Sequence, residues 1–264
     1  MGRALSMLML IAVSAFFATG CGPSFGPQAQ KGITFYCPGA GNIDFGDGGI
    51  REGLSAAGYE GQVASVLWTV SFNPAVDQTL RLNARLAAAR LARAIETYQD
   101  QYPGRPVNVI GLSAGTGVAI WAVESLSKGH SVDNVILLSS SLSSDYDLNK
   151  ALPNVKGKIY NYYSSEDSIL AGPMKLFGTI DGRYFVDGAG AVGLHPPSRA
   201  DRVVNIGWRQ EFARYGYYGG HTDVTSPAFV RAEISGRVTG MPLETAQTGS
   251  ARPVAQALRA ASAD

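Results

Sequence analysis

The feature that most constrains this chain is an alternation of short apolar runs with longer segments of helical periodicity. The apolar runs are rich in β-branched and aromatic residues, which favour buried strands. Such runs predict strands at 33–37, 63–70, 106–110, 132–138, 158–163 and 202–206. Helices are predicted near 77–101 and at 116–127. The alternation therefore predicts an α/β fold with a mostly parallel central sheet and helices on both faces.

One domain accounts for most of the chain. Residues 32–240 carry the whole alternating pattern, without an internal repeat or a second boundary, so a single domain is predicted. Residues 21–31 are predicted to be a flexible tether. Residues 241–264, which are rich in Ala, Gln, Ser and Thr, are predicted to be a flexible tail.

The first twenty residues have the pattern of an export signal. Arg3 supplies a positive charge, and residues 4–17 form an apolar run that is too short to cross a membrane. Residues 18–21 (ATGC) resemble the lipobox of a bacterial lipoprotein, in which the cysteine is lipidated and becomes the new N-terminus. The resemblance implies an exported protein that Cys21 anchors to a membrane of the bacterial envelope. The alternative is simple cleavage after Gly20, which would leave a soluble periplasmic or secreted protein.

Composition and residue spacing argue against several classes of partner. The net charge is +1, and no stripe of Lys and Arg alternates with aromatic residues, so no nucleic-acid partner is predicted. No Cys or His spacing indicates a metal site, and no cofactor is predicted. Besides Cys21, the chain has one cysteine, Cys37. It is predicted to be a buried apolar side chain if Cys21 is lipidated, and otherwise the two could form a disulfide in an oxidising compartment.

The clearest chemical signal is the pentapeptide Gly-Leu-Ser-Ala-Gly at 111–115, between a predicted strand and a predicted helix. G-x-S-x-G in this setting is the nucleophile elbow, a sharp turn that lifts the Ser113 hydroxyl clear of the sheet. Glycine is needed at 111 and 115 because side chains there would collide with neighbouring backbone. The turn also places the serine at a helix N-terminus, which stabilises developing negative charge. We therefore predict that Ser113 is a nucleophile.

With this motif in place, residues 32–235 resemble the α/β-hydrolase family. The resemblance rests on GLSAG after the central strand and on candidate Asp and His residues that follow it in the family's chain order. It implies a serine hydrolase that cleaves a small-molecule or lipid-like ester through an acyl-enzyme intermediate. The alternatives are an acyltransferase with the same triad and a catalytically silent envelope lipoprotein with a binding role.

A serine nucleophile needs a general base, and the chain has three histidines. His130 is predicted at the amino edge of the sheet, on the wrong side for Ser113. His195 lies in a long loop and precedes two prolines. His221 follows the last predicted strand, in the sequence GGHTD, where the family's catalytic histidine lies. The resemblance therefore implies that His221 is the base.

The third member of such a triad is a carboxylate that orients the histidine. Asp167 follows the predicted strand at 158–163, where the family's acid lies, and is the preferred candidate. Its neighbour Glu166 is an alternative, because predicted strand ends err by a few residues. Asp145 and Asp147 follow the preceding strand and are further alternatives, because some family members take their acid from that position.

Acyl transfer also requires N–H donors for the oxyanion. The N–H of Ala114, directly after the nucleophile, is one expected donor. The other is expected from the glycine-containing loop after the first strand, at Ala40 or Gly41, because glycine allows the backbone to approach the site closely.

Two further segments have alternative interpretations. The long loop at 168–201 is either a substrate-binding flap or a structured excursion at the edge of the sheet. Three tyrosines come just before His221, at Tyr215, Tyr217 and Tyr218. They either line a substrate pocket or pack in the core.

Overall fold

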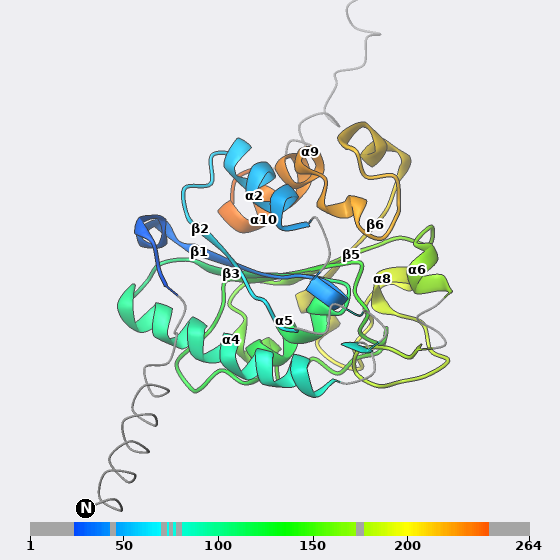
Figure 1. The fold of residues 1–264 in the computed structure, drawn as a ribbon, viewed down its shortest axis with the longest axis horizontal. Helices are drawn as coiled ribbons and strands as arrows, with labels where there is room; N and C mark the ends of the chain where they lie inside the picture. The colour runs from blue at the N-terminus through cyan, green and yellow to red at the C-terminus, as the bar shows by residue number, and fades with distance from the viewer. Residues whose placement is uncertain are drawn as a thin grey trace, which may run out of the picture.

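The computed structural model describes residues 24–42, 46–69, 73, 76–77, 81–172 and 177–242 of the chain. A six-stranded sheet lies at its centre (Figure 1). Its strands are β1 (Ile33–Cys37), β2 (Gln62–Ser65), β3 (Val107–Leu112), β4 (Asn134–Leu138), β5 (Ile159–Tyr163) and β6 (Val203–Gly207). Neighbouring strands all pair in parallel, in the order β2-β1-β3-β4-β5-β6. The parallel sheet predicted from the sequence is confirmed.

Helices cover both faces of this sheet (Figure 1). One face carries α4 (Leu82–Gln101) and α5 (Gly115–Glu124), and the other carries α2 (Gly46–Ala56), α9 (Pro227–Phe229) and α10 (Ser235–Thr239). Strand side chains point alternately to the two faces, so neighbouring residues join different apolar clusters. Phe35 and Val109 pack towards α4 and α5, whereas Tyr36 and Ile110 pack towards the opposite layer. The predicted fold class, a single α/β domain, is thereby confirmed.

Short helical segments make up much of the connecting chain. They are η1 (Pro27–Lys31), η2 (Ala40–Asn42), η3 (Leu152–Asn154), α6 (Ser168–Ala171), α8 (Ala189–Val192), η4 (Ala200–Arg202), η5 (Gln210–Tyr215), η6 (Asp223–Thr225) and the π-helical turn η7 (Val230–Ile234). None of the helices in the described ranges combines the length and the apolar character needed to cross a bilayer.

The strand predicted at 63–70 is shorter in the structure, where β2 ends at Ser65. The chain then leaves the ladder because its backbone meets Asn42, whose side chain accepts the N–H of Trp68 at 3.4 Å and donates to the carbonyl of Thr69. The Trp68 indole N–H donates to the carbonyl of Pro38 at 2.7 Å, and the Thr69 hydroxyl donates to the carboxylate of Asp77 at 2.6 Å. These contacts turn the segment towards the loop after β1.

Helix α2 is not predicted from the sequence, because four of its eleven residues are glycine, a poor helix former. Packing explains why the helix forms. A Cβ atom at Gly49 would lie 1.9 Å from the carbonyl oxygen of Thr225, and one at Gly53 would lie 2.5 Å from Cβ of Val230. The glycines let α2 approach the segment at 225–230 closely.

The predicted tether over 21–31 is wrong from Ser24 onward. Phe25 packs edge-on against the ring of Tyr98, with ring centroids 5.3 Å apart, and the Tyr98 hydroxyl donates to the carbonyl of Ala29 at 2.7 Å. The chain is therefore fastened to the end of α4. The predicted signal peptide at 1–20, the predicted lipidation site at Cys21 and all but the first two residues of the predicted tail at 241–264 lie outside the described residues.

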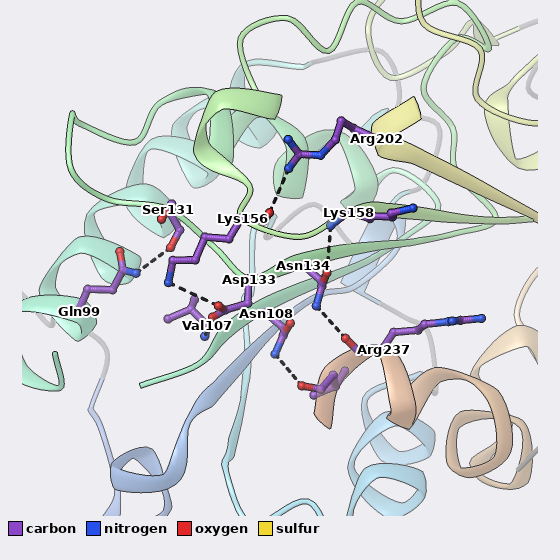
Figure 2. A network of polar contacts seen from close by, with 11 residues as sticks. Gln99, Val107, Asn108, Ser131, Asp133, Asn134, Lys156, Lys158, Arg202 and Arg237 are labelled. Carbon is purple, nitrogen blue, oxygen red and sulfur yellow. Dashed lines mark hydrogen bonds and ion pairs between the residues drawn. The ribbon is translucent and has the colours of Figure 1, made fainter. Parts of the chain in front are cut away.

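Polar side chains hold the amino edge of the sheet together (Figure 2). The Asp133 carboxylate accepts the N–H of Val107 at 2.7 Å. The side-chain amides of Asn108 and Asn134 donate to carbonyls in the last turn of α10, at 3.2 and 3.0 Å. These bonds satisfy carbonyls that lack an intrahelical partner. The polar side chains at the amino ends of the strands are thus bound to other parts of the fold.

Candidate active site

Ser113 lies on a strained turn between β3 and α5. Its φ is +51°, a left-handed conformation that few non-glycine residues adopt. A Cβ atom at Gly111 would lie 2.8 Å from the carbonyl oxygen of Gly115, and one at Gly115 would lie 2.2 Å from the carbonyl oxygen of Cys37. The crowding expected at both glycines is thus present, and the close approach also sets the loop after β1 directly against the elbow.

A continuous chain of hydrogen bonds joins Ser113, His221 and Asp167. The Ser113 Oγ lies 2.8 Å from Nε2 of His221, and Nδ1 of the same ring lies 2.7 Å from Oδ2 of Asp167. With the proton on Nδ1, the ring donates to the carboxylate and accepts the serine hydroxyl. Asp167 is fully buried, whereas the His221 side chain is 14% exposed and Ser113 is half-buried. Of the two ends of this series of hydrogen bonds, Ser113 is therefore the one that solvent reaches.

Asp167 is held by its place at the start of α6. Its Oδ1 accepts the N–H groups of Ile169 and Leu170, both at 3.1 Å, so it is the N-cap of this short helix. Oδ1 is used for capping and Oδ2 for His221. The carboxylate is thereby fixed in the orientation that the imidazole requires.

The loop that carries His221 is closed by Asp223 and Trp208, which are not predicted from the sequence as site residues. Asp223 accepts the N–H of Tyr218 at 2.8 Å, and the indole N–H of Trp208 donates to the carbonyl of Tyr217 at 2.9 Å. Gly219 has a φ of +94°, which a side chain would strain. The signal available in the sequence is an Asp two residues after the histidine, a residue type that commonly closes tight turns.

The other candidate acids are engaged elsewhere. Glu166 is exposed, and its Oε1 accepts the hydroxyl of Ser165 at 3.3 Å. Asp145 is paired with Arg183, whose guanidinium lowers the pKa of the Asp145 carboxyl. Asp147 is exposed and accepts the backbone N–H of Asn149 at 2.9 Å. The structure brings none of the three to His221.

The other two histidines bind groups away from Ser113. His130 lies near the amino edge, with Nε2 3.3 Å from Oδ1 of Asp100. The Nε2 of His195 faces the carbonyl of Val192 at 3.2 Å. Both rings have local partners, and the structure brings only His221 to Ser113.

The expected oxyanion donors differ in whether their N–H groups already make a hydrogen bond within the protein. The Ala114 N–H, at the N-terminus of α5, makes no hydrogen bond to any described group. In the loop after β1, the N–H of Gly41 donates to Oδ2 of Asp77 at 2.7 Å, so the prediction that Gly41 could donate to the oxyanion is wrong. The Ala40 N–H has no acceptor in the part of the chain that the structure describes. Ala40 and Ala114 therefore remain as the candidate pair.

The described parts of the long loop, 168–172 and 177–201, form a structured excursion. The carboxylate of Asp181 accepts both the N–H and the hydroxyl of Ser143, at 2.8 and 2.7 Å. The N–H of Ile180 donates to the carbonyl of Ser141 at 2.9 Å, and that residue's N–H faces the carbonyl of Ser113 at 3.4 Å. The excursion thus packs beside the elbow with its own fixed contacts.

The three tyrosines before His221 divide between the two interpretations. Tyr215 and Tyr217 are buried in the cluster that faces α2, where Tyr217 stacks on the ring of Phe212. Tyr218 is 68% exposed. Only Tyr218 is therefore placed to meet a molecule from solution.

The remaining reactive side chain of the described region is Cys37. It is fully buried on β1, and burial raises the pKa of its thiol far above the usual range. A thiol in this state is a poor nucleophile. Among the described residues, no group of His, Cys, Asp and Glu is arranged to hold a metal ion.

No protein-family model matches the chain, and no curated protein matches it in sequence. Solved structures do resemble it. A dienelactone hydrolase from Anabaena variabilis is 19% identical, with 83% of this chain and 84% of that one covered, at a TM-score of 0.39. A cutinase-like protein from Cryptococcus is 12% identical, with coverages of 83% and 100% and a TM-score of 0.42. The esterase PE8 is 13% identical, with coverages of 76% and 92% and a TM-score of 0.41. Likeness this distant carries no information about substrate, so the chemistry is inferred from the site itself.

Proposed function

We propose that this protein is a serine hydrolase that cleaves carboxylic esters through Ser113, His221 and Asp167. The observation that carries the proposal is the chain of two short hydrogen bonds, 2.8 and 2.7 Å, from the serine hydroxyl through the imidazole to a buried carboxylate. Nucleophile, base and orienting acid are within direct reach of one another, which is the geometric requirement for an activated serine.

In the first step of the proposed reaction, Ser113 Oγ attacks the ester carbonyl carbon while His221 Nε2 takes the hydroxyl proton. The imidazolium that forms is stabilised by the carboxylate of Asp167 at Nδ1. The carbonyl oxygen becomes an oxyanion, for which the N–H groups of Ala114 and Ala40 are the proposed donors. The tetrahedral intermediate then collapses, and His221 returns the proton to the leaving alcohol.

The second step reverses these roles. His221 takes a proton from water, the resulting hydroxide attacks the acyl carbon, and the bond to Ser113 Oγ breaks with return of the proton. An alkoxide is a better leaving group than an amide nitrogen anion, so esters are the substrates that these groups attack over the lower barrier. An alcohol in place of water would give acyl transfer instead, and product analysis distinguishes the two.

The first experiment is labelling of the purified full-length protein with a fluorophosphonate probe. We expect the label on Ser113, because only a serine with a lowered barrier to proton loss reacts with such probes. Ser113→Ala should abolish labelling, and His221→Ala should slow it by about 10³-fold or more. Hydrolysis of p-nitrophenyl esters should fall in parallel.

The matched control is His195→Ala. This ring also belongs to a connection near β6, but its partner is a backbone carbonyl, so the variant should label at the wild-type rate. A folded wild-type protein that takes up no label would contradict the proposal and favour a silent site with a binding role.

A further inference from the structure

We infer that Asp77 is a positioning residue that holds the loop after β1 in the conformation required for the Ala40 N–H to bind the oxyanion. The inference rests on the proposed function and adds to it a residue outside the triad. Asp77 lies far from Ser113 in sequence and belongs to no motif that the chain displays.

The first support is the burial and bonding of the Asp77 side chain. It is fully buried, and its two oxygens point to different segments. Oδ2 accepts the N–H of Gly41 at 2.7 Å, and Oδ1 accepts the hydroxyl of Thr69 at 2.6 Å. Hydrogen bonds to a carboxylate are stronger than those between neutral groups, and they are stronger still away from water. The carboxylate therefore fastens the loop firmly to the segment after β2.

The second support is that Asp77 acts with a further contact on the other side of Ala40. The indole N–H of Trp68, itself buried, donates to the carbonyl of Pro38 at 2.7 Å. The N–H of Asn42 closes the turn on the carbonyl of Gly39 at 3.2 Å. The peptide units before and after Ala40 are thus both held, which limits the directions that the Ala40 N–H can take.

The third support is the position of the loop. The carbonyls of Cys37 and Pro38 lie so close to Gly115 that a Cβ atom there would be 2.2 and 2.3 Å away. Gly41, at a φ of +80°, makes the turn that brings its own N–H onto Asp77 rather than into the site. Within the described residues of this loop, 38–42, Ala40 therefore keeps an N–H that has no acceptor in the described part of the chain, in a segment that packs against the elbow.

The test compares Asp77→Ala with Asp77→Asn in the full-length protein. The readouts are kcat and KM for a p-nitrophenyl ester and the inhibition constant of benzeneboronic acid. This probe adds to a serine hydroxyl and forms a tetrahedral adduct with an oxygen at the oxyanion position. A misplaced donor stabilises both the transition state and the boronate adduct less well. We therefore expect Asp77→Ala to lower kcat by about 10²-fold and to lower boronate affinity in parallel, with KM little changed.

Asp77→Asn should restore most of the activity. Its amide oxygen can accept the N–H of Gly41, and its NH2 group can donate to the hydroxyl of Thr69. If Asp77→Ala does not fold, Thr69→Val replaces it. That variant keeps the side-chain volume but removes the bond from the hydroxyl at residue 69 to Asp77 Oδ1, and we expect about a tenfold loss of kcat with the same parallel loss of boronate affinity.

The matched control is Asp133→Ala, which removes another carboxylate that accepts a backbone N–H at 2.7 Å, but at the opposite edge of the sheet (Figure 2). It should lower the melting temperature and leave kcat and boronate affinity at wild-type values. The inference is overturned if a folded Asp77→Ala protein keeps wild-type kcat and boronate affinity, or if Asp133→Ala loses both equally. A wild-type protein that does not label with fluorophosphonate overturns the proposed function, and the inference with it.

Discussion

Several residues of this site make two contacts each, and one of the two holds the residue in the orientation that the other requires. Ser113 is aimed by a left-handed backbone that the glycines at 111 and 115 make possible. Asp167 caps α6 with one oxygen and meets His221 with the other. All of these residues are predicted from the sequence, because a motif and a strand end mark them. Asp77 has no such mark, since it accepts the N–H of Gly41, which is 36 residues away in the chain and comes near only after folding.

The double use of Asp167 predicts how its variants separate structure from catalysis. Asparagine is also a good N-cap, so Asp167→Asn should keep the melting temperature close to that of the wild type. It should lower kcat for ester hydrolysis by about 10⁴-fold, because a neutral amide neither orients nor stabilises the imidazolium. Steady-state kinetics and thermal unfolding measure the two effects.

The matched control for Asp167→Asn is the same change in its exposed neighbour, Glu166→Gln, which should leave both quantities unchanged. Equal losses in the two variants, or a fully active Asp167→Asn, would contradict the proposed role of Asp167.

At the scale of elements, prediction succeeds where the apolar pattern is strong and fails where packing replaces propensity. β1, β3, β4, β5 and β6 lie within a few residues of their predicted positions. α2 is missed because its glycines argue against a helix. The helices after His221 are missed as well, although Val230, Ile234 and Val238 recur at helical spacing. Both groups pack against each other over the same face of the sheet, as Figure 1 shows.

Two glycines of α2 should respond in opposite ways to alanine. At Gly53 a Cβ atom would lie 2.5 Å from Val230 Cβ and 2.6 Å from the carbonyl oxygen of Pro227, so Gly53→Ala should lower the free energy of unfolding by about 1–3 kcal/mol. Gly48 is exposed and meets nothing within 4 Å, so Gly48→Ala should raise it by up to about 1 kcal/mol. Urea denaturation measures both, and the same sign for the two would contradict the packing described for α2.

At the scale of the whole molecule, the two ends of the parallel strands differ in what they carry. The candidate site lies at the carboxyl ends of the strands, where parallel sheets place their ligands. The segment at 24–31 is fastened at the amino edge, near the end of α4. Cys21 is three residues from Ser24 in the sequence, so a lipid at Cys21 would hold the molecule at the end opposite the site. The anchored protein would then offer its site to molecules in the aqueous phase.

This arrangement predicts that lipidation affects location and leaves catalysis unchanged. In the wild type, mass spectrometry should find an N-terminal peptide that begins at an acylated Cys21. Cys21→Ser should lose the acyl chains, while kcat for a soluble ester stays at the wild-type value. Cys37→Ala is the matched control and should keep the acyl chains. A mature peptide that begins with unmodified Cys21 would favour the soluble alternative.

The sequence by itself determined the order and type of the strands, the elbow and the chain order of Ser113, Asp167 and His221, because apolar periodicity and local turn chemistry are properties of neighbouring residues. The tertiary structure alone decided which carboxylate meets His221, that Gly41 is engaged by Asp77, and that α2 forms at all. These outcomes depend on hydrogen bonds and close contacts between segments that are distant in the chain. No local pattern records such contacts, since their energy exists only once the sheet has brought the segments together.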